Sequence, residues 1–224
     1  MNSLNNVNDV NNVHGTNGAS RVNHGRPVGR VCAKIYSPNA AFPDERLVPI
    51  FQQWIRDGAF AGVLLDVADY THVPDGPGVV LVGHETTFSM DRSDGRLGLV
   101  AQHRRPFARD TGDAGDGGDA SGGVVATLQA LFDVADELER AMVDADVRLD
   151  RTRIRVESND RLRAPNTDAG FASFAPVIAE AARRVMGGGE VVVERVANDR
   201  RERLAVDVWV VGSANLPLDQ DVGW

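Results

Sequence analysis

The stretch from residue 66 to residue 85, D-V-A-D-Y-T-H-V-P-D-G-P-G-V-V-L-V-G-H-E, decides how the chain folds. An almost continuous apolar run covers residues 63–67, and a second one covers residues 79–82. Apolar runs of this length are typical of central strands that are buried on both faces. The segment 74–78 between them is rich in proline and glycine, which favour a tight turn. The stretch therefore predicts two buried strands joined by a rigid turn.

The flanking sequence predicts further elements of both kinds. On the N-terminal side we expect a strand over residues 31–36 and a helix over 47–57, where apolar residues recur at helical spacing up to Gly58. Pro49 must lie in the first turn of that helix or kink it. On the C-terminal side, strands are expected over 86–90 and 97–101, joined by a loop that contains Asp94-Gly95.

The second half of the chain repeats the mixture. An apolar stripe from Val124 to Met142 predicts the clearest helix. Alternation over residues 153–157 predicts a half-exposed strand. Thr167 and Asp168 are candidate caps of a helix over 171–186. Strands over 191–196 and 204–211 are expected to close the domain as a hairpin.

The predicted order, β-α-β-β-β-β-α-β-α-β-β, favours an α+β fold in one domain over residues 29–212. We expect a mostly antiparallel sheet with about three helices on one face. The segments L-V-P-I-F and F-A-P-V-I, each inside a predicted helix, resemble one another. They suggest two related β-α-β-β halves.

Three segments are expected to lie outside this domain's ordered core. Residues 1–28 are rich in Asn and poor in apolar side chains, which predicts a disordered tail. Residues 108–123 are rich in Gly and Asp and predict a flexible acidic loop, and residues 213–224 form a C-terminal tail.

Composition excludes several classes of function. The 224 residues carry a net charge of −8, which argues against binding to nucleic acid or to an anionic membrane surface. No apolar run is long enough for a membrane span, and no signal sequence is recognisable. The single cysteine, Cys32, excludes an intramolecular disulfide and is expected to pack in the core. We therefore expect a cytoplasmic protein.

Ionisable side chains gather in the stretch 66–85, and the candidate binding residues there are Asp69, His72, Asp75, His84 and Glu85. A metal site made of Asp69, His72, His84 and Glu85 is one interpretation, because His and carboxylate ligands suit divalent transition metals. Acid–base catalysis by an Asp beside a His is another. Side chains that only cap and brace the Pro/Gly turn are the third.

The outcome depends on how the strands pair. If residues 63–68 and 79–84 pair as antiparallel neighbours, Asp69 and His84 lie at opposite ends of the pair. If the turn folds back differently, Asp69, His72 and His84 converge. A second candidate set is Arg161 and Arg163, which precede a predicted helix and could hold a carboxylate or a phosphate.

The segments D-V-A-D-Y-x-H-V-P-D-G-P-G-V-V-L-V-G-H-E, S-M-D-R-S-D-G-R-L-G-L and R-L-R-A-P-N-T-D resemble an uncharacterised family of bacterial proteins. The resemblance covers about residues 30–211. It implies no activity, cofactor or catalytic residue, but it places the polar stretch and the R-L-R loop in the same domain.

The leading hypothesis is a non-catalytic module that binds a small ligand or a protein partner, with no cofactor. The site would use His72, Asp75, His84 and Glu85, with Arg161 and Arg163. The alternative is a metal-assisted hydrolase or isomerase that uses Asp69, His72, His84 and Glu85. A homo-oligomer is compatible with either interpretation.

Overall fold

The structure, a computed structural model, describes residues 29–39, 42–74, 76–105, 107 and 120–212. The predicted tails 1–28 and 213–224, and residues 108–119 of the predicted acidic loop, lie outside the described residues. Within the described part, none of the helices is long and apolar enough to cross a membrane.

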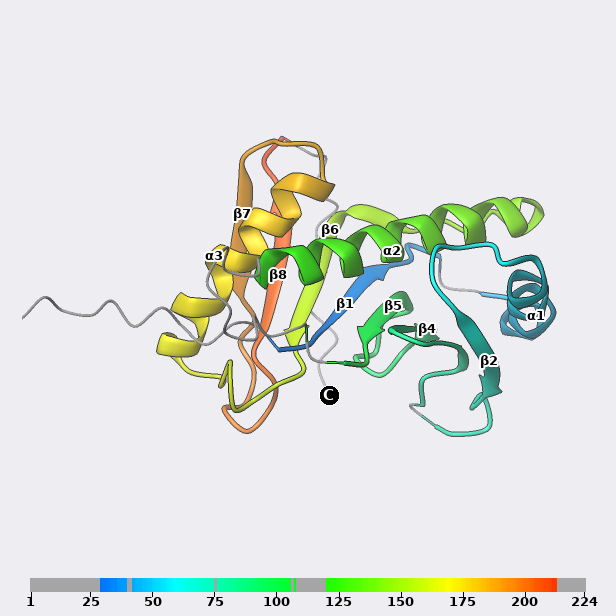
Figure 1. Ribbon diagram of the computed structural model, residues 1–224, viewed down its shortest axis with the longest axis horizontal. Helices are drawn as coiled ribbons and strands as arrows, with labels where there is room; N and C mark the ends of the chain where they lie inside the picture. Colours follow the sequence, from blue (N-terminus) through cyan, green and yellow to red (C-terminus); the bar gives the residue numbers. More distant parts are fainter. Residues whose placement is uncertain (1–28, 40–41, 75, 106, 108–119, 213–224) are drawn as a thin grey trace, which may run out of the picture.

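The elements follow the predicted order (Figure 1). The strands are β1 (Val31–Tyr36), β2 (Leu64–Asp69), β3 (Val79–Gly83), β4 (Thr86–Asp91), β5 (Gly98–His103), β6 (Asp150–Ser158), β7 (Val191–Arg195) and β8 (Ala205–Val210). The helices are α1 (Leu47–Asp57), α2 (Ala120–Ala141) and α3 (Asp168–Val185), with short 3-10 turns at Asp44–Arg46 and Val143–Ala145.

All eight strands form one antiparallel sheet in the order β2-β3-β4-β5-β1-β6-β8-β7. The predicted α+β domain is therefore confirmed. β1 and β6 pair in the interior of the sheet, and each is followed by a helix and an antiparallel meander whose last strand returns beside it. The first meander has four strands and the second has two, so the two halves share a connection but differ in size.

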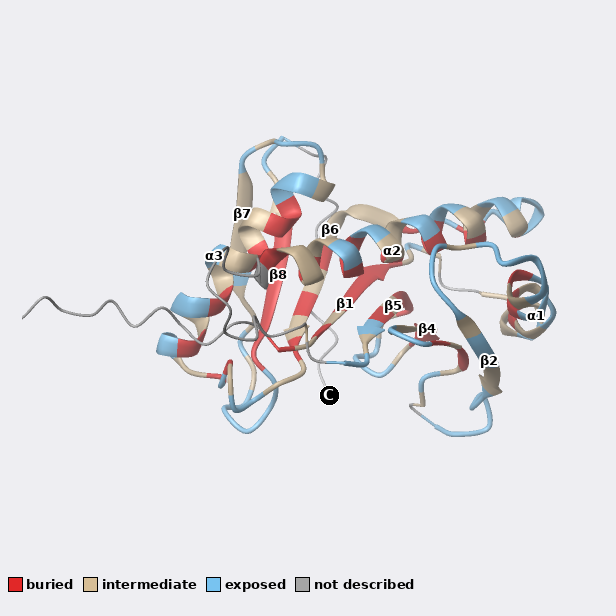
Figure 2. Ribbon diagram, viewed as in Figure 1, coloured by how far each residue is buried: buried red, intermediate tan, exposed pale blue. Residues whose placement is uncertain are grey.

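One face of the sheet and the three helices enclose the core. Ala33 and Ile35 of β1 are fully buried and pair with apolar residues of β5 and β6. α2 and α3 pack against each other and, together with α1, against this face (Figures 1 and 2). Burying the apolar stripe of each helix against one sheet face is what drives the two layers together.

The opposite face of the sheet is polar and separate from this core. Its buried residues are Lys34, Tyr36, Val80, Ser89, Asp91, Ala205 and Asp207, and none of them belongs to the apolar cluster. Cys32 lies on the same side, because it alternates with the core residues Val31 and Ala33. The expectation that Cys32 packs in the core is therefore wrong.

Local signals in the sequence set several element ends. Pro49 lies in the first turn of α1, where its missing N–H removes no helical hydrogen bond, and Gly58 ends the helix at a positive φ of 61°. Thr167 caps α3, and its side chain accepts a hydrogen bond from the backbone N–H of Gly170 at 3.1 Å.

Two predictions about the elements are corrected. β2 is the edge strand of the sheet and not a central one, and Leu65 within it is 50% exposed. Its apolar run was indistinguishable from that of a central strand because α1 packs against this edge and needs apolar partners. The predicted loop 108–123 is also too long, since Ala120–Gly123 form the first turn of α2.

Candidate functional site

The predicted polar stretch is split between the two ends of the β2–β3 hairpin. The two strands are antiparallel, with Asp69 opposite Val79 and Leu64 opposite Gly83. His84 and Glu85 follow β3 and so lie at the Leu64 end, five residues along β2 from Asp69. At about 3.4 Å per residue this is roughly 17 Å. The four residues of the metal-site interpretation therefore do not converge.

Asp69 and His72 belong to an exposed turn. One carboxylate oxygen of Asp69 accepts hydrogen bonds from the backbone N–H and the hydroxyl of Thr71, at 2.9 and 2.7 Å. These bonds hold the pKa of Asp69 below its usual value. Asp69 thus braces the turn, as the third interpretation of the sequence expected. Asp75 lies outside the described residues. Among the residues that the structure describes, no group of three or more His, Cys, Asp or Glu is placed to hold a metal ion.

The arginine loop lies in the other half of the sheet. Arg161 is exposed in the connection between β6 and α3. Arg163 forms an ion pair with Asp160, with 3.4 Å between its Nε and the carboxylate. β6 is separated from β3 by β1, β5 and β4, so neither arginine joins His84 and Glu85 in one site.

His84 and Glu85 instead lie at a cavity of about 430 Å³. It is formed by the connection from α1 to β2 with the start of β2, the β3–β4 turn and β4, the end of β5, and the middle of α2. Its lining residues are Phe60, Ala61, Gly62, Val63, Leu64, Gly83, His84, Glu85, Thr86, Phe88, His103, Ala126, Thr127, Gln129, Ala130, Asp133 and Val134.

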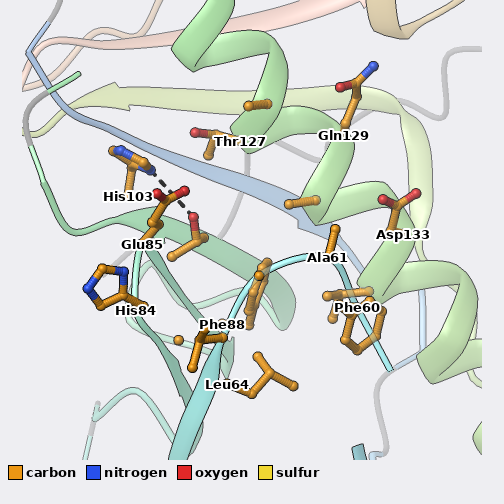
Figure 3. A pocket seen from close by; sticks show the side chains of 17 residues that line it. Phe60, Ala61, Leu64, His84, Glu85, Phe88, His103, Thr127, Gln129 and Asp133 are labelled. Carbon is orange, nitrogen blue, oxygen red and sulfur yellow. Dashed lines mark hydrogen bonds between the residues drawn. The ribbon is translucent and has the colours of Figure 1, made fainter. Parts of the chain in front are cut away.

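The cavity has an apolar side and a polar side (Figure 3). Phe60, Leu64 and Phe88 lie together at one end, and Glu85 and His103 lie together at the other, with α2 running beside both. The volume and the few polar groups are typical of a small-molecule site. Among the described residues, Glu85 and Asp133 are the carboxylates of the lining, and no Lys or Arg belongs to it.

His103 is the polar residue of the cavity that the sequence did not reveal as a site residue. It pairs with Thr86 across β4 and β5, and its Nδ1 lies 3.4 Å from the Thr86 hydroxyl. Its ring packs on Phe107, with centroids 4.5 Å apart. Burial lowers the pKa of His103, although the charge of Glu85 opposes the shift. The imidazole is therefore neutral at neutral pH and able to exchange hydrogen bonds with a ligand.

The two arginines after His103 fix the β3–β4 turn. The guanidinium group of Arg104 donates a hydrogen bond to the carbonyl oxygen of Gly83 at 2.9 Å. The backbone N–H of Arg104 donates to the carbonyl oxygen of Glu85 at 2.7 Å. Arg105 lies 2.8 Å from Nε2 of His84. In the sequence these residues are a short basic run with no evident partner, and only the pairing of β4 with β5 shows that they brace the turn.

A second polar cluster lies on the opposite face of the sheet. The ammonium group of Lys34 donates to Asp91 at 3.1 Å, to Asp94 at 2.5 Å and to the carbonyl oxygen of Arg96 at 2.8 Å. Burial raises the pKa of Asp94, but the hydrogen bond and charge of Lys34, together with hydrogen bonds from Tyr36 and the backbone of Arg96, outweigh burial and lower it. Arg155 donates two hydrogen bonds to Asp207, at 3.0 and 3.1 Å.

This cluster satisfies its own charges and leaves little capacity for chemistry. The Tyr36 hydroxyl donates to Asp94 at 2.8 Å, and burial raises the pKa of Tyr36. Burial, and then the charge of Glu157, raise the pKa of the neighbouring Cys32 thiol to about 12, which makes it a weak nucleophile. We therefore interpret this cluster as structural and the cavity beside His103 as the candidate site.

No protein-family model, no curated protein and no solved structure matches this chain, so the resemblance to an uncharacterised bacterial family stays a prediction.

Proposed function

We propose that the protein is a binding module whose cavity between α2 and the β3–β4 turn takes a small, mainly apolar molecule. The observation that carries the proposal is the cavity of about 430 Å³ with its apolar side and its polar end. Apolar ligand surface would pack on Phe60, Leu64 and Phe88, since burial of such surface is the main source of affinity in sites of this kind.

The polar end defines the charge of the ligand. Glu85 lies at this end beside His103, which is neutral, whereas Asp133, the other carboxylate of the described lining, lies on α2 on the side of Ala61 and Phe60 (Figure 3). A ligand carboxylate would meet the like charge of Glu85 there. An amine would meet an opposite charge, and a hydroxyl could bond to the His103 ring. The cavity therefore favours an apolar molecule that carries an amine, accepts a neutral analogue less well, and disfavours an anionic one.

The binding geometry is fixed before the ligand arrives. Arg104 and Arg105 brace the β3–β4 turn, and the pairing of Thr86 with His103 holds the polar end to the sheet. A rigid site loses less conformational entropy on binding. This supports recognition of one small molecule over adaptation to many partners.

The test compares three ligands with one carbon skeleton: 4-phenylbutylamine, 4-phenylbutanol and 4-phenylbutyrate. Binding is measured by saturation-transfer NMR and by the shift in thermal unfolding. We expect the amine to bind best and the carboxylate worst. Glu85→Gln should reduce the preference for the amine over the alcohol.

A cavity-filling variant provides the structural control. Ala130→Trp places an indole in the cavity and should abolish binding of all three ligands. Ala172→Trp makes the same change on an exposed position of α3, outside the cavity, and should leave binding intact. Binding that survives Ala130→Trp, or a wild-type protein that binds none of the three ligands, would refute the proposal.

A further inference from the structure

A second cleft, of about 540 Å³, lies between the β6–α3 connection and the β7–β8 hairpin. Its lining residues are Glu157, Arg161, Asn198, Arg201, Glu202 and Arg203. The two loops lie side by side at the lower left of Figure 1, far along the sheet from β3 and the first cavity. The cleft is separate from the cavity proposed above as the ligand site.

The two loops are fixed to each other by one buried side chain. Asn166, which is 4% exposed, donates from its amide nitrogen to the side-chain oxygen of Asn198 at 2.7 Å and to the carbonyl oxygen of Asp199 at 2.9 Å. Its amide oxygen accepts a hydrogen bond from Arg195 at 2.8 Å. The loop that carries Arg161 is thereby held against the loop that carries Arg201 by contacts within the fold.

Two guanidinium groups of the cleft have no partner among the described residues. Among the described residues, neither Arg161 nor Arg201 makes a side-chain hydrogen bond or an ion pair. The carboxylate of Asp199, two residues before Arg201, accepts the backbone N–H of Arg201 at 2.7 Å and not its guanidinium group. Arg203 lies 3.6 Å from Glu157, a loose contact. Other arginines of this acidic protein, such as Arg151, Arg153 and Arg155, are engaged with carboxylates.

We propose that this cleft binds a phosphate group, with Arg161 and Arg201 as its principal ligands. A guanidinium group presents a planar fork of donors that matches the oxygens of phosphate, and two such groups from different loops can share one tetrahedral dianion. Three arginines face two glutamates in the cleft, so the local charge is positive within a protein of net charge −8. The amide of Asn198 donates to the Arg203 carbonyl oxygen at 2.9 Å and so braces the hairpin.

The test follows the arginine side chains directly. Inorganic phosphate is titrated into ¹⁵N-labelled full-length protein at low ionic strength, and the Nε–Hε signals of Arg161 and Arg201 are recorded by NMR. Benzoate and phenyl phosphate form the second arm, which separates a planar monocarboxylate from a phosphate monoester. We expect saturable shifts with phosphate and phenyl phosphate, and much weaker ones with benzoate.

Four variants decide the assignment. Arg161→Gln and Arg201→Gln should each weaken phosphate binding about tenfold, the usual effect of losing one charge-assisted contact. Glu202→Gln should strengthen binding, because it removes a like charge from the cleft. Arg56→Gln removes an exposed arginine of α1 that also lacks a partner among the described residues, and should change nothing. Shifts that do not saturate, or that persist unchanged in Arg201→Gln, would overturn the proposal.

Discussion

Replacement of Lys34 by Met tests whether the polar cluster of Lys34, Asp91 and Asp94, on the sheet face opposite the helices, stabilises the fold. The Lys34 side chain is 8% exposed, and its ammonium group donates to three acceptors. Met preserves most of the side-chain volume, so the main effect is a missing cation beside two carboxylates. Removing one partner of a buried pair costs about 3–5 kcal/mol of the free energy of unfolding.

The structure places the expected loss at the lower end of that range. Asp91 keeps two hydrogen bonds from Ser93, and Asp94 keeps those from Tyr36 and from the backbone of Arg96. We therefore expect a loss of about 3 kcal/mol. With an m-value of about 2 kcal/mol per molar urea, the midpoint of urea unfolding should fall by about 1.5 M.

Two further variants separate charge from packing. Adding Asp91→Asn to Lys34→Met should recover part of the loss, because the buried carboxylate is then neutral. Arg148→Met breaks an exposed pair with Asp146 and should cost less than about 1 kcal/mol. If Lys34→Met also costs less than about 1 kcal/mol, the value for an exposed pair, the cluster does not stabilise the fold.

Two other predictions concern the candidate site and the second half of the fold. Burial lowers the pKa of His103 from 6.5 in the folded protein. As the pH falls below 6.5, the unfolded chain therefore binds a proton at His103 more readily than the folded protein does. The free energy of unfolding should decrease from pH 6.5 down to the lower pKa of the folded state. Urea unfolding measured between pH 7.5 and 5 should show that decrease. The variant His103→Gln should flatten the pH profile, whereas His72→Gln, at an exposed position, should not. An unchanged pH profile in His103→Gln would contradict the burial argument. Thr167→Ala removes the N-cap of α3 and should cost about 1 kcal/mol. Thr167→Asp keeps an acceptor and should cost less; an equal loss in both variants would contradict the capping argument.

The sequence predicted the fold because its local signals agree with one another. Gly58 and Thr167 mark helix ends that the structure confirms, and the alternation of residues 153–157 matches the half-exposed β6. Such consistency between levels is what allows a chain to specify one structure. The position of a strand within the sheet was harder to predict, since β2 has the apolar run of a central strand but lies at the edge.

The candidate site was only partly predictable, because it depends on contacts between distant segments. His84 and Glu85 were identified, and they do line a cavity. Asp69 and His72 were grouped with them, but the antiparallel register of β2 and β3 separates the two pairs. His103 could be recognised only once β4 and β5 were paired, since nothing in its own segment distinguishes it from the two basic residues that follow.

The pairing of β1 with β6 inside the sheet has a consequence for synthesis of the chain. Ile35 pairs with Ile154, which the ribosome adds about 120 residues later. β2 to β5 can fold onto one edge of β1 as soon as they emerge, but the other edge stays unpaired until β6 is complete. An unpaired apolar edge is prone to association with other chains. The rate at which residues 150–158 reach β1 is therefore expected to limit the yield of folded protein.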